Sequence, residues 1–263
     1  MTSNHHDIEP PLELPGPGAL VITGGSRGLG AELAVRAARA GAAVAIVHRE
    51  RADRAAAVVR AIETSGGRAI ALAADIGDER AVVQAFEVID RELGGVAGLI
   101  NNAVDAGPPM PFVELRAGDV ERVFRTNAFG AMWCSREAAR RMSTRLGGRG
   151  GAIVSLSSAV AVTTGAPGSW VHFAASKGAL ETMSRGLAKE LAPDGIRVNL
   201  VRVGMMLTET RMTQSEDYRR RLLAQVPIGR MAEVAEVAAA VLWLLSSRAS
   251  YVTGAELDVT GAY

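Results

Sequence analysis

A short apolar run that ends in a cluster of glycines restricts the fold of this chain more than any other feature. Residues 19–23 read ALVIT, and the sequence from residue 23 to residue 30 is TGGSRGLG. Glycines let the backbone turn sharply and approach a bound group closely, while the first amides of the following helix can bind a phosphate. A glycine loop placed after a strand and before a helix therefore predicts a dinucleotide-binding unit.

Strand-like and helix-like segments alternate along the rest of the chain. Strands separated by helices of about ten or more residues are typical of βαβ units, whose right-handed crossovers build a parallel sheet covered on both faces. We expect an α/β fold with a single doubly wound (Rossmann) sheet that is mostly parallel, with seven strands and with helices on both faces. Expected strands lie at residues 19–23, 43–47, 68–74, 97–101, 152–156, 196–201 and 255–259, and expected helices at residues 29–40, 51–64, 79–93, 119–146, 170–191 and 234–246.

The length and composition suit one large domain. The chain has 263 residues, and hydrophobic residues make up 48% of it, which is enough for a sizeable core. Residues 1–18 contain four prolines and little apolar periodicity, so we expect a flexible proline-rich tail there. The Rossmann domain is expected over residues 19–263, with a substrate lid near residues 205–225.

Charge and cysteine content argue against several classes of protein. The net charge is +1 without a basic block, so we expect no nucleic-acid partner. The single Cys134 rules out an internal disulfide framework and a multi-cysteine site, and we expect no metal. No uncharged apolar run approaches about eighteen residues and no signal pattern opens the chain, so we expect no membrane partner and a cytoplasmic location.

Several motifs resemble those of the short-chain dehydrogenase/reductase family. They are the T-G-x-x-x-G-x-G loop, N-N-A at residues 101–103, R-T-N at 125–127, A-S-K at 175–177 and Y-V-T-G at 251–254. The resemblance covers roughly residues 19–260 and implies a nicotinamide dinucleotide cofactor, a small-molecule substrate and a homotetramer or homodimer. The cofactor-binding residues that it implies, together with those argued from charge, are Gly24, Ser26, Arg27, Gly28, Leu29, Gly30, His48, Arg49, Asp75, Ile76, Asn102, Ala103, Lys177, Gly204 and Thr208.

The end of the second expected strand indicates which cofactor is used. An acidic residue about 20 residues beyond the glycine loop would bind the ribose hydroxyl of NAD, but this chain has His48 and Arg49 there. Arg27 lies in the loop itself, and guanidinium groups recognise phosphate through paired donors. We therefore expect NADP(H), the alternative being that both arginines are merely solvated.

The residues that resemble the catalytic unit of the family include one substitution. The resemblance implies roles for Asn127, for Ser158 (with Ser157 as the alternative) and for Lys177. The family has a catalytic tyrosine four residues before the lysine, where this chain has Phe173. Val104 and Val203 also replace a glycine and a proline of the family motifs.

Phenylalanine cannot donate a proton, which leaves four interpretations of this site. An engineered Tyr→Phe change explains Phe173 but neither valine. The protein otherwise reduces a substrate that needs no proton donor, such as an iminium ion, or catalyses a non-redox cyclisation or isomerisation, or is a dinucleotide-binding pseudoenzyme. We favour an NADP(H)-dependent oxidoreductase acting on an imine, iminium or carbonyl group, because Ser158, Lys177 and Asn127 are all retained.

Four further residues are candidates for contact with the substrate. Trp170, Met205 and Met206 are expected to form an apolar wall with Phe173, although core packing explains the two methionines equally well. His172 has a near-neutral ordinary pKa but is rotated about 100° from Phe173 on a helix, so we expect it to pack or to hydrogen-bond beside the site.

Overall fold

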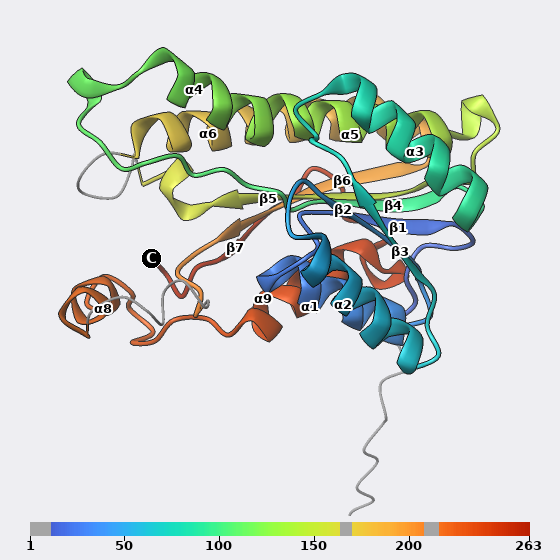
Figure 1. Cartoon of the computed structure of the whole chain (residues 1–263), viewed down its shortest axis with the longest axis horizontal. Coiled ribbons are helices and arrows are strands. Elements are labelled where there is room, and N and C mark those ends of the chain that lie inside the picture. Colours follow the sequence, from blue (N-terminus) through green and yellow to red (C-terminus); the bar gives the residue numbers. More distant parts are fainter. Residues whose placement is uncertain (1–11, 164–169, 208–215) are drawn as a thin grey trace, which may run out of the picture.

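Seven parallel strands form one sheet at the centre of the protein (Figure 1). The computed structural model describes residues 12–163, 170–207 and 216–263, and within these the strand order is β3-β2-β1-β4-β5-β6-β7. Each neighbouring pair is parallel, so the expected seven-stranded Rossmann sheet is confirmed and contains no antiparallel pair among the described strands. The strands are β1 (Ala19–Thr23), β2 (Ala43–His48), β3 (Ala69–Ala73), β4 (Val96–Asn101), β5 (Gly151–Ser158), β6 (Ile196–Val203) and β7 (Glu256–Val259).

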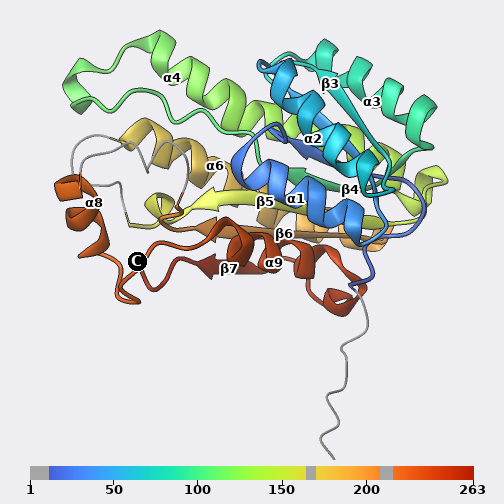
Figure 2. The ribbon, with the colours of Figure 1, turned by 60° about the horizontal axis from the view of Figure 1, so that its bottom comes forward.

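Helices cover both faces of the sheet (Figures 1 and 2). One face packs against α1 (Gly28–Arg39), α2 (Ala52–Thr64) and α9 (Val234–Leu245). The other packs against α3 (Glu79–Leu93), α5 (Ala131–Met142) and α6 (Val171–Leu191). The remaining helices are α4 (Ala117–Phe124) and α8 (Glu216–Leu223), with short 3₁₀ turns η1 (Phe112–Glu114), η3 (Thr144–Leu146), η4 (Ala159–Ala161), η5 (Ala192–Asp194) and η6 (Ser247–Ala249).

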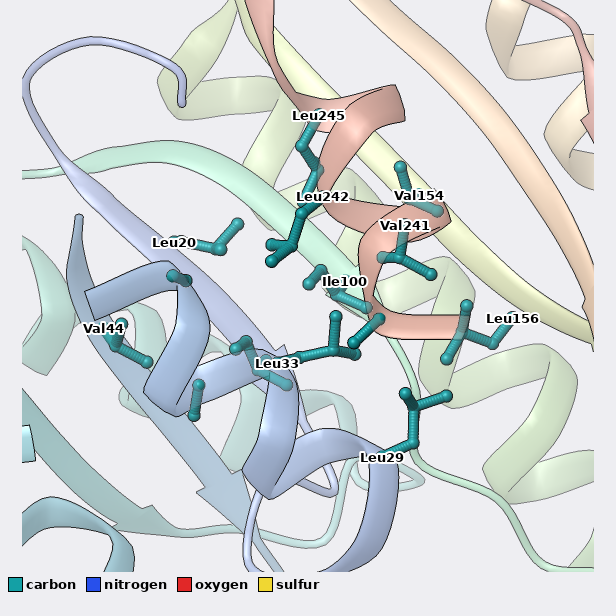
Figure 3. Packing of buried hydrophobic residues seen from close by; sticks show 14 of the residues in the cluster. Leu20, Leu29, Leu33, Val44, Ile100, Val154, Leu156, Val241, Leu242 and Leu245 are labelled. Carbon is teal, nitrogen blue, oxygen red and sulfur yellow. The ribbon is translucent and has the colours of Figure 1, made fainter. Parts of the chain in front are cut away.

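Most positions of the central strands are apolar because both faces of these strands are buried. In β1, Leu20 and Ile22 join the core under α1 and α9, while Ala19 and Val21 join the core under α3 and α5. Side chains alternate across a strand, so a strand between two helical layers favours apolar residues at successive positions. Figure 3 shows the first of these cores, where leucines of α1 and α9 meet over the strands.

The long helix expected over residues 119–146 is interrupted, so this prediction was wrong in part. A π-helical stretch, η2 (Arg125–Gly130), separates α4 from α5, and α5 ends at Met142. Gly130 lies against Ile76, where an added Cβ would come within 2.6 Å of the Ile76 Cγ1 atom. Single π-helical turns often occur at functional sites, and this one carries Asn127.

The segment expected to be a flexible tail includes residues that contact the core. Leu12 and Leu14 pack against the core under α1 and α9, and the Ser247 amide donates a 2.9 Å hydrogen bond to the Glu13 carbonyl. The core that Leu12 and Leu14 pack against is formed by distant segments, so the local composition could not predict this contact. Residues 1–11 lie outside the described residues.

The strand order creates a crevice at one end of the sheet. The chain moves outward from β1 to β2 and β3, and then in the opposite direction from β4 onward. Connections therefore diverge beyond the carboxyl ends of β1 and β4, the position where sheets of this type bind ligands. No helix among the described residues is long and apolar enough to cross a membrane.

Candidate active site

The glycine loop follows β1 with a backbone that side chains would disrupt. Gly24 has a φ of +66°, and a Cβ there would come within 2.9 Å of the Ala103 Cα atom. A Cβ on Gly30 would overlap the Gly24 carbonyl oxygen and would lie 2.6 Å from the Asn102 Nδ2 atom. The loop therefore needs glycine at both positions in order to fold against the end of β4.

Hydrogen bonds hold this loop against the end of β4. The Asn102 side-chain amide donates to the carbonyls of Thr23 and Gly24 at 2.8 and 3.0 Å. In return, the Thr23 hydroxyl accepts from the amides of Asn102 and Ala103, both at 3.0 Å. Asn102 and Ala103, predicted from the resemblance to bind cofactor, thus shape the loop that would hold it.

Beyond the loop, the structure leaves room for a phosphate-bearing group. Gly28 begins α1 with a φ of +54°, and a Cβ there would meet no atom within 4 Å. No side chain caps the first amides of α1. An adjoining cleft of about 530 Å³ is lined by Arg27, Arg49, residues 104–108, Asp119 and Arg122. Open amides, a positive helix end and nearby arginines together fit a dinucleotide.

The two arginines reach this cleft from different elements. Arg27 directly precedes α1 and Arg49 directly follows β2, and both line the cleft. The side chain of Arg49 is 48% exposed, and among the described residues its ion pair is with the exposed carboxylate of Glu50, at 3.2 Å, so it is available to a ligand. His48 is buried, with its Nδ1 atom 3.2 Å from the Glu50 carbonyl oxygen, and does not line the cleft.

Two other cofactor candidates follow β3. The Asp75 carboxylate accepts a 2.9 Å hydrogen bond from the Gly77 amide and shapes the turn before α3. Ile76 is 6% exposed and packs against Gly130 of η2. Asp75 thus stabilises the turn after β3, and Ile76 packs this turn against η2.

The last cofactor candidates follow β6. Gly204 passes so close to Thr260 that a Cβ would lie 2.6 Å from the Thr260 Cα atom, which requires glycine there for packing. Thr208 lies outside the described residues. Within the loop itself, Leu29 is buried in the core, whereas Ser26 is half-buried.

Asn127 joins three elements. Its Oδ1 atom accepts from the Asp105 amide at 2.8 Å, and its Nδ2 atom donates to the Asp105 carbonyl at 2.7 Å and to the Ser176 hydroxyl at 2.9 Å. The π-helical turn places this buried amide between the segment after β4 and α6. Asn127 therefore fixes one wall of the cleft relative to the helix that carries Lys177.

Phe173 and Lys177 lie together on α6. The Lys177 ammonium is 5.9 Å from the centroid of the Phe173 ring and donates a 2.7 Å hydrogen bond to the Leu156 carbonyl of β5. Trp170 packs edge-on against Phe173, with the ring centroids 6.2 Å apart and the planes at 72°. The structure thus assembles an aromatic pair beside a buried ammonium, with no hydroxyl on either ring.

The two candidate serines at the end of β5 have different surroundings. Ser157 is buried, and its hydroxyl donates a 2.7 Å hydrogen bond to the Glu181 carboxylate. Ser158 is the half-buried last residue of the strand, and its hydroxyl accepts a long contact of 3.5 Å from the Val160 amide. Because Ser157 is engaged in the interior, the geometry favours Ser158 as the serine that can meet a substrate.

His172 turns away from the phenylalanine. It is 3% exposed, and neither ring nitrogen has a hydrogen-bond partner among the described residues. A Cβ on Gly107 would come within 2.7 Å of the His172 Nε2 atom. His172 therefore packs behind the segment after β4, as its rotation about the helix predicts.

The two methionines of the expected substrate wall have packing partners. Met205 is 7% exposed and forms a small cluster with Val226 and Met231. Met206 packs against the core under α1 and α9 and forms an isolated parallel bridge with Ala232. These contacts support the packing alternative for both residues, and part of the expected lid, residues 208–215, lies outside the described residues.

Sequence reasoning missed three charged residues of the cleft. The Arg122 Nε atom lies 3.0 Å from the Asp105 carboxylate, and Asp119 lies 3.9 Å from the same guanidinium. The Asp105 carboxylate also accepts a hydrogen bond from the Gly107 amide. The sequence pattern D-x-G could have indicated this local turn. The pairing with Arg122 depends on how α4 packs, which no local pattern encodes.

Burial makes Lys177 an unusual lysine. It lowers the pKa of the ammonium from 10.5 to about 8, and the negative charge of Glu181 partly opposes this effect. Below about pH 8, Lys177 is charged in the folded and the unfolded protein alike. Between about pH 8 and 10.5 the unfolded protein binds more protons, so the free energy of unfolding rises with pH.

We expect this rise to disappear in a Lys177→Met variant. The fall in the pKa of Lys177 corresponds to about 3 kcal/mol at ~1.4 kcal/mol per pH unit. Between about pH 8 and 10.5, the free energy of unfolding of the wild-type protein should therefore rise by that amount relative to the variant. Urea unfolding of the cofactor-free proteins at several pH values measures it. Lys189, the other lysine of the chain, is exposed, so Lys189→Met should retain the wild-type slope. Parallel curves for wild type and Lys177→Met would show that Lys177 is not buried as a charge.

The described residues contain no group of three or more His, Cys, Asp or Glu side chains placed to hold a metal ion.

Comparisons with known proteins agree with this geometry. The family model described as enoyl-(acyl carrier protein) reductase matches residues 24–263. The Escherichia coli K12 protein named uncharacterized oxidoreductase YgfF is 43% identical over 242 residues, covering 92% of this chain and 98% of that protein.

Two solved structures show the same architecture with cofactors bound. A short-chain dehydrogenase from Burkholderia cenocepacia J2315 in complex with NADP is 33% identical, with a TM-score of 0.85, covering 95% of this chain and 98% of that one. A 7α-hydroxysteroid dehydrogenase complexed with NADH and 7-oxo glycochenodeoxycholic acid is 32% identical, with a TM-score of 0.87, covering 95% of each chain.

Proposed function

Because this chain belongs to the short-chain dehydrogenase/reductase family, we propose that it is an NADP(H)-dependent oxidoreductase that acts without a phenolic proton donor. Its substrate class is a small apolar imine, iminium or carbonyl compound. The observation that carries the proposal is Phe173, held between Trp170 and the Lys177 ammonium at the position of the family tyrosine.

The preference for NADP(H) rests on charge. Structures similar to this one hold either NADP or NADH, so family membership leaves the choice open. Arg27 and Arg49 line the same cleft beside the start of α1, and no acidic residue follows β2 at the position that would bind a ribose hydroxyl. A phosphate on that ribose is the ligand group that two guanidinium groups suit.

The residues of the site suit a substrate that needs little proton transfer. When bound, the cofactor supplies a hydride ion. An iminium carbon that accepts hydride becomes part of a neutral amine, whereas a ketone becomes an alkoxide that requires a proton. Phe173 cannot donate that proton. Ser158 can hydrogen-bond to the substrate heteroatom, and the Lys177 ammonium can stabilise a developing negative charge.

A panel of cyclic imines and the ketones of matching carbon skeleton tests the proposal, with NADPH oxidation and product formation measured together. We expect faster turnover of the imines. Ketone turnover should fall above about pH 8 as Lys177 loses its proton, whereas turnover of an N-alkylated cyclic iminium, which carries a permanent charge, should not. Product formed without NADPH oxidation would indicate a non-redox enzyme. Tight NADPH binding without any turnover would indicate a binding protein.

A further inference from the structure

A second charged residue is buried next to Lys177. Glu181 lies one helical turn further along α6, so the two side chains share a face of the helix. Glu181 is 5% exposed and Lys177 is 3% exposed. A carboxylate removed from water is costly unless other groups compensate its charge and fill its hydrogen bonds.

Arg202 and Ser157 provide that compensation. The Arg202 guanidinium donates from Nε to one Glu181 oxygen and from Nη2 to the other, both at 2.8 Å. The Ser157 hydroxyl donates to the first oxygen at 2.7 Å. Ser157 and Arg202 are paired residues of β5 and β6, and α6 packs over both strands (Figure 1). The carboxylate thus joins the helix to two neighbouring strands.

The outer side of Arg202 is also paired. Its guanidinium contacts Glu256 and, at 3.2 Å, Asp258, both on β7, and Arg185 of α6 contacts Glu256. The hydrogen bonds to Glu181, and after them those to Glu256 and Asp258, raise the pKa of Arg202 against the effect of burial, so it stays charged. The charged and polar groups that face Glu181 are therefore Lys177, Arg202 and Ser157, with Glu256, Asp258 and Arg185 one contact further out.

Three consecutive residues of β5 connect this network to the active site. Leu156 accepts the Lys177 hydrogen bond, Ser157 donates to Glu181, and Ser158 ends the strand at the substrate side. Lys177 and Glu181, from adjacent turns of α6, therefore hydrogen-bond to adjacent residues of β5. A movement of Glu181 would displace the strand end that carries Ser158 and the carbonyl that orients Lys177.

We propose that Glu181, clamped by Arg202 and Ser157, is a positioning residue that fixes the end of β5 and keeps the Lys177 ammonium charged for the reaction. The expected effect of Glu181 on turnover rests on the proposed function, whereas its expected effect on Lys177 does not. The electrostatic part of the proposal follows from the buried carboxylate, whose charge raises the pKa of Lys177 against the effect of burial.

The presence of only two lysines allows a direct test. Protein labelled with ¹³C at the lysine ε-carbon gives one NMR signal for Lys177 and one for Lys189, assigned with Lys189→Arg. In a Glu181→Gln variant, which keeps the side-chain shape and removes the charge, we expect the Lys177 titration midpoint to fall by about one pH unit. Glu256→Gln removes another carboxylate bound to Arg202 but not facing Lys177, so its midpoint should stay near that of wild type.

A second variant covers the case in which Glu181→Gln does not fold. Glu181→Met replaces the carboxylate with an apolar side chain of similar length and leaves Arg202 paired with Glu256 and Asp258. The Lys177 midpoint should fall in this variant as well. An unchanged midpoint in either folded variant would overturn the proposal, whether or not any substrate is ever found.

Turnover provides the positioning readout. With a substrate from the panel, Glu181→Gln should lower kcat about tenfold while the Kd for NADPH changes less than about threefold, because the glycine loop and the cleft arginines are untouched. An unchanged kcat at a pH where Lys177 stays charged would overturn the positioning role. Absence of turnover in wild type would count against the proposed function, and the NMR result would still decide the role of Glu181.

Discussion

Replacing Phe173 with tyrosine is expected to raise kcat/KM for ketone reduction by about 10²–10⁴-fold, the usual contribution of a positioned general acid. The ring already packs against Trp170 with its centroid 5.9 Å from the Lys177 ammonium. A phenol beside a buried ammonium has a lowered pKa and can give up its proton. Reduction of a permanently charged iminium substrate should change less than about threefold, since the hydride alone completes that reaction.

The control for this experiment is Phe173→Leu. This variant removes the aromatic ring and adds no hydroxyl, so it should not increase the rate of ketone reduction. The measurement is initial rates of NADPH oxidation with matched ketone and iminium substrates. Ketone activity of wild type equal to that of Phe173→Tyr would mean that another group already donates the proton, and our account of the site would then be wrong.

Removing both Arg27 and Arg49 should weaken NADPH binding by about 10²-fold or more. Hydrogen bonds to charged groups typically contribute about 1.5–3 kcal/mol each, and a tenfold change in Kd corresponds to about 1.4 kcal/mol. NADH lacks the ribose phosphate, so its Kd should change less than about threefold in Arg27→Ala/Arg49→Ala. Fluorescence titration of the two reduced cofactors at fixed salt measures both constants.

Arg51→Ala is the matched control for the two cleft arginines. Arg51 is close to Arg49 in the sequence but does not line the cleft, and its Nε atom lies 3.6 Å from Asp53. Its replacement should leave both cofactor affinities near the wild-type values. Equal losses for NADH and NADPH in the double variant would place the arginines on a part common to both cofactors. No loss at all would remove them from the site.

The sheet could be predicted from the sequence because its signals are local. Apolar runs such as residues 19–23 mark strands buried on both faces, and the right-handed crossover rule then restricts their order. The helix over residues 119–146 was predicted as continuous because its apolar pattern continues through η2. Only contacts with the turn after β3 and the segment after β4 favour the extra residue in that turn.

The site was predictable in part for the same reason. Motif spacing selected Lys177, Phe173 and Asn127 as candidates and indicated a phenylalanine where the resemblance implies a tyrosine. It favoured Ser158 and left Ser157 as the alternative, because the two serines are adjacent at the end of β5. The choice depends on Glu181, which reaches Ser157 from α6 across the face of the sheet.

By itself, the sequence determined the chemical identities: a glycine loop after the first strand, arginines in that loop and after the second strand, and a residue without a hydroxyl four before Lys177. These are properties of single residues and of short spacing, and they need no fold to be read. Only the tertiary structure decided that Glu181 meets Arg202, that Asp105 pairs with Arg122 and that Met205 packs inward. Such contacts depend on strand register and helix packing between distant segments, which are set by the whole chain at once.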